Sequence, residues 1–174
     1  MKLNTPSPSL ADAMPEGPGA IFDVLARRIQ ENVGYLLMTV LVPASDASFL
    51  DRVFSTNQDQ YPLGKADPIE DSIWFRRLFA EGKAIVANDV EAIRVWLPGF
   101  DAYLAQGYGS LVNIPIVLSG NTIGLLNLMD EAGHFTAKRI AVLRQELPVA
   151  ALAIFASGER NARTGSSNPR NSSG

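Results

Sequence analysis

The chain has 174 residues, which is the size of a single domain, and its 47% hydrophobic and 19% charged residues are typical of a folded globular protein. The net charge of -3 argues against nucleic acid as a partner, because phosphate binding needs a concentrated basic surface. The chain has no cysteine and one histidine, His134, so its own residues cannot supply disulfides, thiol chemistry or a multi-histidine metal site.

Neither end of the chain has the pattern of a packed core. Residues 1–19 carry four prolines and no apolar run, which predicts a flexible N-terminal segment without a secretory signal. Residues 157–174 form a polar stretch that predicts a disordered tail. The longest apolar stretches have about ten residues, half of the ~20 that cross a bilayer. We therefore expect a cytoplasmic protein that has no membrane partner and folds over residues 20–156.

The first part of this domain predicts a helix followed by a hairpin. Residues 20–33 repeat apolar side chains at helical spacing, and Gly34 follows them as a stop signal. Residues 35–42 form a continuous apolar run typical of a buried strand. Residues 49–56 alternate imperfectly, as expected of a more exposed partner strand, and residues 57–70 read as a long loop.

The middle of the domain predicts short elements. A helix over residues 73–81, capped by Asp71 or Ser72, presents Trp74 on its apolar face and precedes a strand over residues 83–87. Residues 91–106 are rich in aromatic side chains and are interrupted by a proline-glycine pair, which predicts a broken helix.

A second hairpin is predicted over residues 110–118 and 122–129, with Gly120 and Asn121 in its turn. That register pairs Asn113 with Leu128 on the narrower face of the hairpin, and Ile114 with Asn127 on the bulkier face that suits packing against helices. The last helix is predicted over residues 136–156, with a cap at its first residue and a bend at Pro148.

The order and spacing of four segments resemble the GAF domain family over residues 21–156. These segments are GKAIVANDV, GSLVNIPIVLSGNTIGLLNL, HFTAKRIAVL and LPVAALAI, at residues 82–90, 109–128, 134–143 and 147–154. The resemblance implies an α+β, GAF/PAS-like fold: a central antiparallel sheet of about six strands, with the terminal helices on one face. It also implies a small-molecule pocket on the other face, covered by the irregular helical segment.

Departures from known GAF subtypes narrow the expected ligand. Covalent bilin attachment and the reduction of free methionine sulfoxide both use cysteine in this family, so the absence of cysteine excludes both. Cyclic-nucleotide members resemble an N-K…F…D-E pattern, of which this chain matches Asn127 and Phe135. Leu128 stands at the position of the lysine, and Arg139 and Ile140 stand where acidic residues are expected, so cyclic-nucleotide binding is in doubt.

Six residues are candidates for contact with a ligand: Trp96, Phe100, Tyr103, Tyr108, Asn113 and Asp89. The four aromatic side chains can enclose a ligand or fill a second small core. Asn113 and the other strand asparagine, Asn127, need polar partners, which a ligand, water or the backbone can supply. Asp89 can bind a ligand or cap a turn. No catalytic or metal-ligating residue and no cofactor is predicted.

The predicted function is non-enzymatic sensory or regulatory binding of an unknown small molecule. Helices 20–33 and 136–156 are expected to form a homodimer. The alternative is an interaction module whose pocket is filled by its own side chains. An enzyme would have to use acid–base chemistry by Asp89, Tyr103 or His134, and no spacing in the sequence indicates it.

Overall fold

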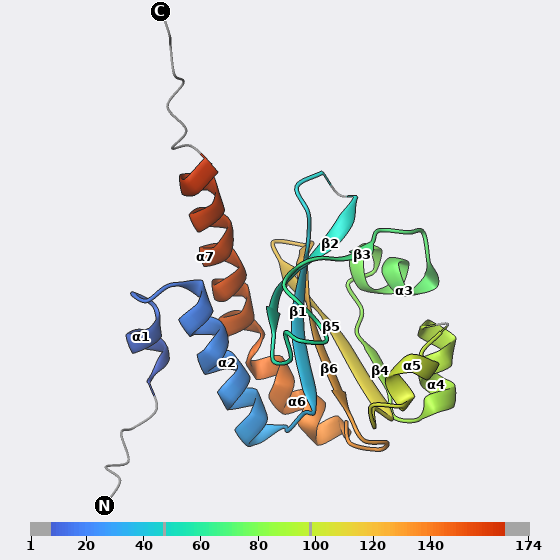
Figure 1. The fold of residues 1–174 in the computed structure, drawn as a ribbon. Coiled ribbons are helices and arrows are strands. Elements are labelled where there is room, and N and C mark those ends of the chain that lie inside the picture. The colour runs from blue at the N-terminus through green and yellow to red at the C-terminus, as the bar shows by residue number, and fades with distance from the viewer. Residues whose placement is uncertain (1–7, 47, 98, 166–174) are drawn as a thin grey trace, which may run out of the picture.

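The computed structural model describes residues 8–46, 48–97 and 99–165 (Figure 1). Its centre is a six-stranded antiparallel sheet with strand order β3-β2-β1-β6-β5-β4. The strands are β1 Leu37–Pro43, β2 Phe49–Ser55, β3 Gly64–Pro68, β4 Ile85–Ala87, β5 Ser110–Leu118 and β6 Asn121–Asp130. The helices are α1 Leu10–Ala13, α2 Pro18–Asn32, α3 Ile73–Phe75, α4 Val90–Trp96, α5 Asp101–Leu104, α6 Ala137–Gln145 and α7 Leu147–Gly165, and the π-helical turn η1 spans Arg76–Ala80. This α+β architecture confirms the predicted fold class.

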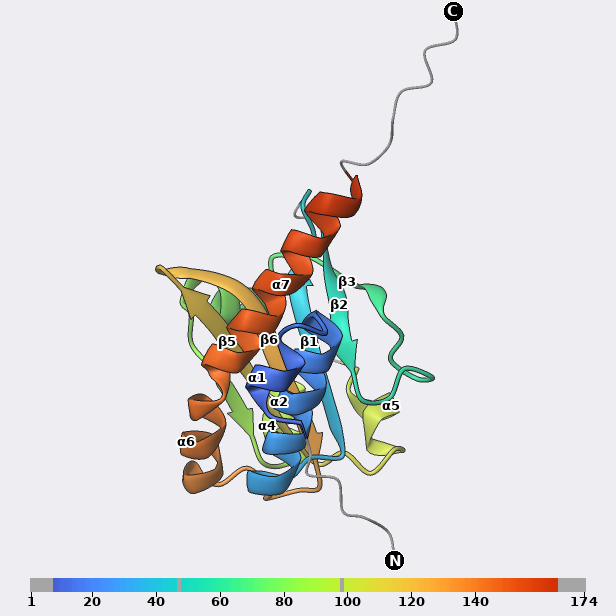
Figure 2. The same ribbon diagram turned by 90° about the vertical axis from the view of Figure 1, so that its left-hand side faces the viewer.

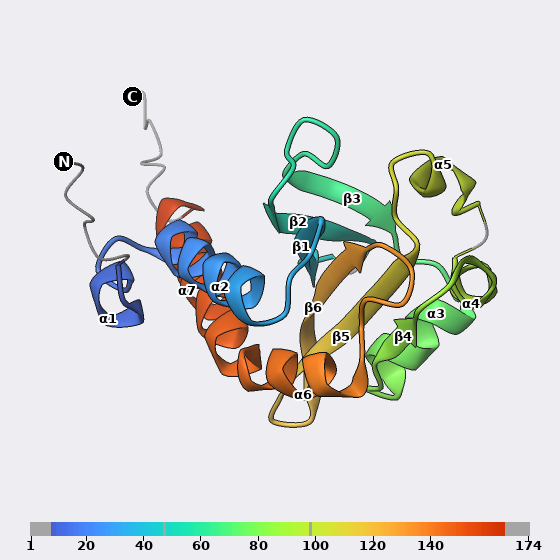
Figure 3. The ribbon, with the colours of Figure 1, turned by 90° about the horizontal axis from the view of Figure 1, so that it is seen from below.

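The helices α2, α6 and α7 cover one face of the sheet, and α2 and α7 lie side by side on it (Figures 2 and 3). The apolar stripe of α2, including Leu25 and Ile29, is fully buried against this face. Alternate residues of the central strands, such as Val40, Ile114 and Leu126, complete the same core. The main hydrophobic core therefore lies between the sheet and the terminal helices, as expected.

The short helices α3, α4 and α5 lie on the opposite side of the sheet (Figure 3). Two smaller clusters of buried residues lie on this side, one around Ile93, Phe100 and Leu111 and one around Leu41 and Leu78. This second layer does not fill the space above the sheet, as the site described below shows.

The register of the β5–β6 hairpin differs from the sequence prediction by one residue. The turn residues are Ser119 and Gly120, both with positive φ, as in the tight turns that match the twist of a hairpin. A bulge follows, because Ile116 pairs with Gly124 and Val117 with Thr122, which leaves Ile123 as an extra residue.

The shifted register changes which side chains share a face. Asn113 pairs with Asn127 rather than with Leu128, and a one-residue slip exchanges the two faces of a strand. Asn127, predicted to face the helices, therefore lies on the same face as Asn113.

Strand β3 and the two ends of the chain also differ from the sequence prediction. Strand β3 lies within residues 57–70, which were predicted to form only a loop, and it forms by pairing with β2. The short helix α1 lies in the segment predicted to be flexible, with Ala13 buried against α2, and residues 1–7 lie outside the described residues. Helix α7 extends to Gly165, within the segment predicted to be disordered, and residues 166–174 lie outside the described residues.

The predicted last helix is two helices, α6 and α7, that meet at Glu146 with a bend of 43°. Pro148 is the second residue of α7, where its missing N–H costs no helical hydrogen bond. The predicted cap is confirmed, because the Thr136 side chain accepts a hydrogen bond from the Arg139 backbone N–H. Among the described residues, no single helix has the length and apolar character to cross a membrane, and only the bent pair of α6 and α7 together reaches that length.

Candidate functional site

A cavity of about 400 Å³ lies between the sheet and the layer formed by α3, α4 and α5. Strands β1, β2, β3, β5 and β6 form its floor and one wall, and the segments around α3, α4 and α5 form its roof. Its lining residues are Leu37, Thr39, Leu41, Arg52, Tyr61, Asp67, Pro68, Glu70, Ser72, Trp74, Phe75, Trp96, Leu97, Gly99, Phe100, Tyr103, Asn113, Asn127 and Met129. The volume falls in the range of pockets that hold small molecules.

Four of the six predicted site residues line this cavity: Trp96, Phe100, Tyr103 and Asn113. In the roof, the Phe100 and Tyr103 rings are parallel with centroids 5.2 Å apart, and Tyr61 continues the stack at 6.1 Å from Tyr103. The Arg52 guanidinium carbon lies 5.7 Å from the Tyr61 ring centroid, within cation–π range. A column of flat groups therefore runs along one side of the cavity.

The other two predicted residues, Tyr108 and Asp89, lie elsewhere. Tyr108 is buried in the cluster around Phe100 and Leu111 and is not a cavity-lining residue. The Asp89 carboxylate caps α4 by accepting a hydrogen bond from the Ala92 backbone N–H at 2.8 Å. Both residues have the structural roles that the sequence left open as alternatives.

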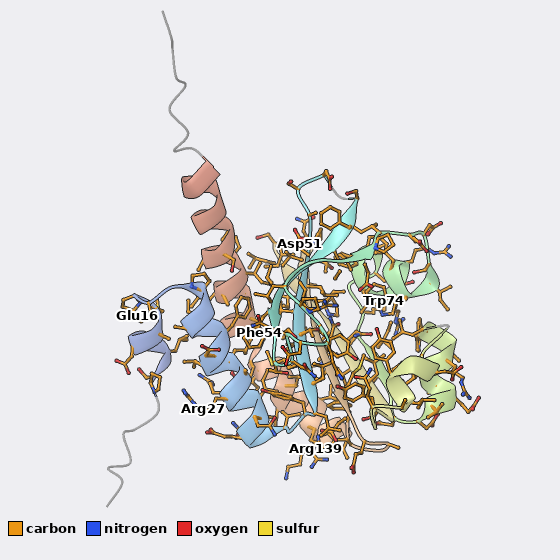
Figure 4. The ribbon with its side chains drawn as sticks, viewed as in Figure 1. Glu16, Arg27, Asp51, Phe54, Trp74 and Arg139 are labelled. Atoms are coloured by element: carbon orange, nitrogen blue, oxygen red, sulfur yellow. The ribbon has the colours of Figure 1, made fainter. Side chains whose placement is uncertain are left out.

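The cavity floor carries a continuous chain of side-chain hydrogen bonds. The Trp74 indole Nε1 donates to Asn113 Oδ1 at 2.9 Å, and Asn113 Nδ2 donates to Asn127 Oδ1 at 2.6 Å. Asn127 Nδ2 then donates to Thr39 Oγ1 at 3.3 Å. The oxygen and the nitrogen of each strand asparagine thus have one side-chain partner apiece, and the hydrogen-bonded side chains come from three strands and one helix. Figure 4 shows Trp74, which belongs to α3, on the side of the sheet opposite α2 and α7.

The charged residues of the cavity gather toward β2 and β3. Arg52 donates from Nη1 to the Pro62 carbonyl at 2.9 Å, and its Nε is buried without a hydrogen-bond partner among the described residues. Asp67 and Glu70 are exposed at the rim. The cavity therefore has a cation along its wall and carboxylates at its mouth.

Burial of the two cavity tyrosines disfavours their ionised forms. It raises the pKa of Tyr61 to about 12, with smaller contributions from Tyr108 and Tyr103. It also raises the pKa of Tyr103, further raised by the Asp67 carboxylate and opposed by Arg52. Both hydroxyls are therefore neutral at physiological pH, and the Tyr61 hydroxyl donates to Gln106 Oε1 at 3.0 Å.

His134 lies outside the cavity lining. Its Nε2 lies 3.0 Å from the Val33 carbonyl oxygen and 3.2 Å from that of Gly34, and its Nδ1 lies 3.4 Å from Asp130 Oδ1. These contacts hold the end of α2 against the start of the α6 segment. Within the stretches 8–46, 48–97 and 99–165, no three His, Asp or Glu side chains gather in a way that could hold a metal ion.

Sequence reasoning missed several lining residues, among them Trp74, Arg52 and Thr39. Trp74 was assigned only to the apolar face of a helix, whereas its indole N–H anchors the floor hydrogen bonds. Arg52 lies in β2, where apolar and polar residues alternate imperfectly. This imperfect alternation is the feature of the sequence that indicates polar side chains on the cavity face of the strand.

A family model described as the GAF domain matches residues 17–154. The chain belongs to the GAF domain family. GAF domains are a sensory and regulatory family that binds small molecules, and the cavity of this member lies between the sheet and its irregular helical segment. A comparison with curated protein sequences returned no match.

Solved structures share the GAF fold of this chain at low sequence identity. The GAF domain of a two-component sensor histidine kinase from Bacillus halodurans has a TM-score of 0.65 and 17% identity, over 82% of this chain and 97% of that one. A GAF domain/HD domain protein from Geobacter sulfurreducens has a TM-score of 0.63 and 14% identity, over 79% and 92%. A type II free methionine-R-sulfoxide reductase from Thermoplasma acidophilum has a TM-score of 0.59 and 13% identity, over 83% and 95%.

Proposed function

We propose that this GAF domain is a sensor that binds a small molecule in the cavity between the sheet and the α3–α5 layer. The observation that carries the proposal is a hollow of about 400 Å³ with aromatic rings in its roof and hydrogen-bonding groups on its floor. Pockets of this composition combine a large apolar contact with a few polar groups that orient the ligand. The hollow favours this function over an interaction module whose pocket is filled by side chains.

We propose binding without turnover. The reductase among the structural neighbours is an enzyme, but this chain contains no cysteine, and the cavity lining contains no histidine. The lining carboxylates, Asp67 and Glu70, belong to exposed residues at the rim of the cavity. The ionisable groups present therefore support recognition of a ligand better than acid–base catalysis.

We further propose that the domain forms a homodimer through its terminal helices, mainly through α7. The surface of α2 is partly covered by α1, which packs against it (Figure 2). On α7, Phe155 is 56% exposed and lies among partly buried Leu152, Ile154 and Ala156. A large exposed aromatic residue on an otherwise packed helix is suited to contact with a second copy.

Ligand binding can be tested by a thermal-shift screen of metabolite classes together with native mass spectrometry of gently purified protein. A ligand at about 100 times its Kd stabilises the folded state by about 2.7 kcal/mol, which is easily detected. The variant Met129→Trp places a bulky ring in the cavity from β6, whereas Val95→Trp adds the same ring at an exposed position on α4 outside it.

The expected result is a hit whose thermal shift is lost in Met129→Trp and kept in Val95→Trp. A shift that survives equally in both variants would place the ligand outside this cavity. The failure of every metabolite class to stabilise the wild-type protein would contradict the sensor function.

A further inference from the structure

We propose that the cavity takes a planar aromatic molecule that presents a hydrogen-bond acceptor oxygen, from a carbonyl or a carboxylate, to its floor. This inference rests on the proposed function and adds the chemical class of the ligand. It follows from the direction of the hydrogen-bond chain that Trp74 begins.

An amide side chain can present either its oxygen or its nitrogen, but an indole N–H can only donate. Trp74 therefore makes Asn113 present its oxygen to the indole and its nitrogen to Asn127. Asn127 must in turn accept with its oxygen and donate with its nitrogen, to Thr39. One donor-only group at the start thus sets the orientation of both amides.

The hydrogen-bonded series from Trp74 to Thr39 still contains N–H and O–H hydrogens that have no acceptor in the described stretches of the chain. Each amide nitrogen carries two hydrogens, and Asn113 and Asn127 each use one of them on the next side chain. The Thr39 hydroxyl accepts from Asn127 and has no acceptor of its own among the described residues. Buried donors without a partner are costlier and rarer than carbonyl oxygens with an unused lone pair. A ligand oxygen that accepts from this floor therefore relieves the larger deficit.

Arg52 gives an independent indication of the same polarity. Its Nε is buried without a hydrogen-bond partner among the described residues, and the residue lines the cavity from β2. A guanidinium can only donate. The wall of the cavity thus carries a donor-only cation, in agreement with the amide donors of the floor.

The shape of the ligand follows from the aromatic rings that line the cavity. Trp96, Phe100 and Tyr103 line it from the α4 and α5 segments, and Trp74 and Phe75 from α3. Flat apolar surfaces favour a flat apolar ligand body, because stacked rings gain contact on both faces.

The carboxylates of Asp67 and Glu70 could in principle favour a cationic ligand instead. Both are exposed at the rim, where hydration and salt weaken such attraction. The buried donors of the floor therefore dominate the preference.

The test compares three naphthalene probes that share one ring system: naphthoate, methyl naphthyl ketone and naphthylmethylammonium. The first two present an acceptor oxygen, one charged and one neutral, and the third presents only donors. Dissociation constants measured by ligand-observed NMR on the full chain are expected to be about tenfold lower for the acceptors, equivalent to one satisfied buried donor. A lower dissociation constant for naphthoate than for the ketone would show that the cavity prefers a carboxylate to a carbonyl oxygen, and would indicate that Arg52 contacts this carboxylate.

The variant Trp74→Phe removes the donor that orients the chain, so Asn113 can turn its oxygen toward the cavity. We expect the preference for acceptors to fall below about threefold in this variant. The matched control, Trp96→Phe, changes an indole in the same cavity that has no hydrogen-bond partner within the described part of the chain, and should keep the preference. If Trp74→Phe does not fold, Asn113→Asp supplies the second test, because it can accept from Trp74 but cannot donate, and it should favour the ammonium probe.

The outcomes separate this inference from the proposed function. Equal binding of all three probes, or a preference that survives in both Trp74→Phe and Asn113→Asp, would leave a binding cavity but overturn the assigned ligand chemistry. Binding of none of the probes, with a metabolite that still raises the Tm of the wild-type protein, would overturn the assigned ligand chemistry and keep the sensor function, whereas failure of the probes and of every metabolite class would overturn both.

Discussion

At Gly124 the side chain of Ile154 from helix α7 packs directly on the backbone of the sheet, so Gly124→Ala is a sharp test of this packing. A methyl group on Gly124 would lie 2.7 Å from Ile154 Cδ1 on α7 and 2.8 Å from the Leu41 carbonyl oxygen on β1. The Ile154 side chain can rotate away, but the Leu41 carbonyl belongs to the backbone of the sheet and cannot move without disturbing it. The variant must therefore shift α7 or strain the β1–β6 pairing.

Overpacking of this kind costs about 1–3 kcal/mol. In a domain of this size, each kcal/mol lowers the Tm by roughly 2–4 °C, so the expected loss is roughly 2–12 °C. Urea and thermal unfolding followed by circular dichroism measure it. Combining Gly124→Ala with Ile154→Val should recover only part of the loss, because the shorter side chain relieves the contact with α7 and leaves the one with Leu41.

The matched control is Gly158→Ala, an exposed glycine farther along α7 with open space around it. Alanine is the better helix former by about 1 kcal/mol, so this variant should be unchanged or more stable. A wild-type midpoint for Gly124→Ala would refute the close approach of α7 to β6. Destabilisation by both variants would show that the effect is not specific to that contact.

Three further predictions concern other parts of the molecule. Tyr61 should keep its proton to about pH 12 in the folded state and lose it near pH 10 when unfolded, so the free energy of unfolding should fall between these two pH values. In urea titrations, Tyr61→Phe should make this fall shallower. Arg28→Met leaves the buried Glu146 carboxylate without the guanidinium whose Nε lies 3.0 Å from Oε2. The variant Arg28→Met should lower the free energy of unfolding by about 1–3 kcal/mol in chemical denaturation. This cost is smaller than for a fully buried pair because the Arg28 side chain is 43% exposed, and an unchanged stability would show that water replaces the arginine. Phe155→Glu should convert the proposed dimer to a monomer in light scattering, whereas Val95→Glu, equally exposed on α4, should not; a dimer that survives Phe155→Glu would move the interface away from this part of α7.

Elements with their own apolar period were predictable from sequence. The stripe of α2 and the apolar runs of β1 and the β5–β6 hairpin each contain enough repeats to identify a face. Strand β3 has no such pattern, since GKADP is short and polar, and it becomes a strand only through pairing with β2. Secondary structure that depends on a distant partner leaves little trace in its own residues.

Apart from Asn113, a polar residue in an apolar strand, the candidate site was predictable where its residues belong to one local segment. Trp96, Phe100 and Tyr103 are close in sequence and lie together in the roof. The floor brings together Trp74 and Asn127, from distant parts of the chain, and a single bulge determines which face Asn127 occupies. Moving the turn by one residue shifts each cross-strand partner by two and keeps its face, so the reversal comes from the bulge at Ile123, and no local pattern in this hairpin signals that extra residue.

The outermost strands of the sheet, β3 and β4, have five and three residues, and β3 ends in Pro68. Short borders that include a proline offer few free backbone groups to a strand from another molecule. Sheet-to-sheet growth between copies of this domain is therefore poorly supported by its own backbone. The proposed dimer consequently relies on side-chain contacts of the helical layer, which can form and separate without rebuilding any strand.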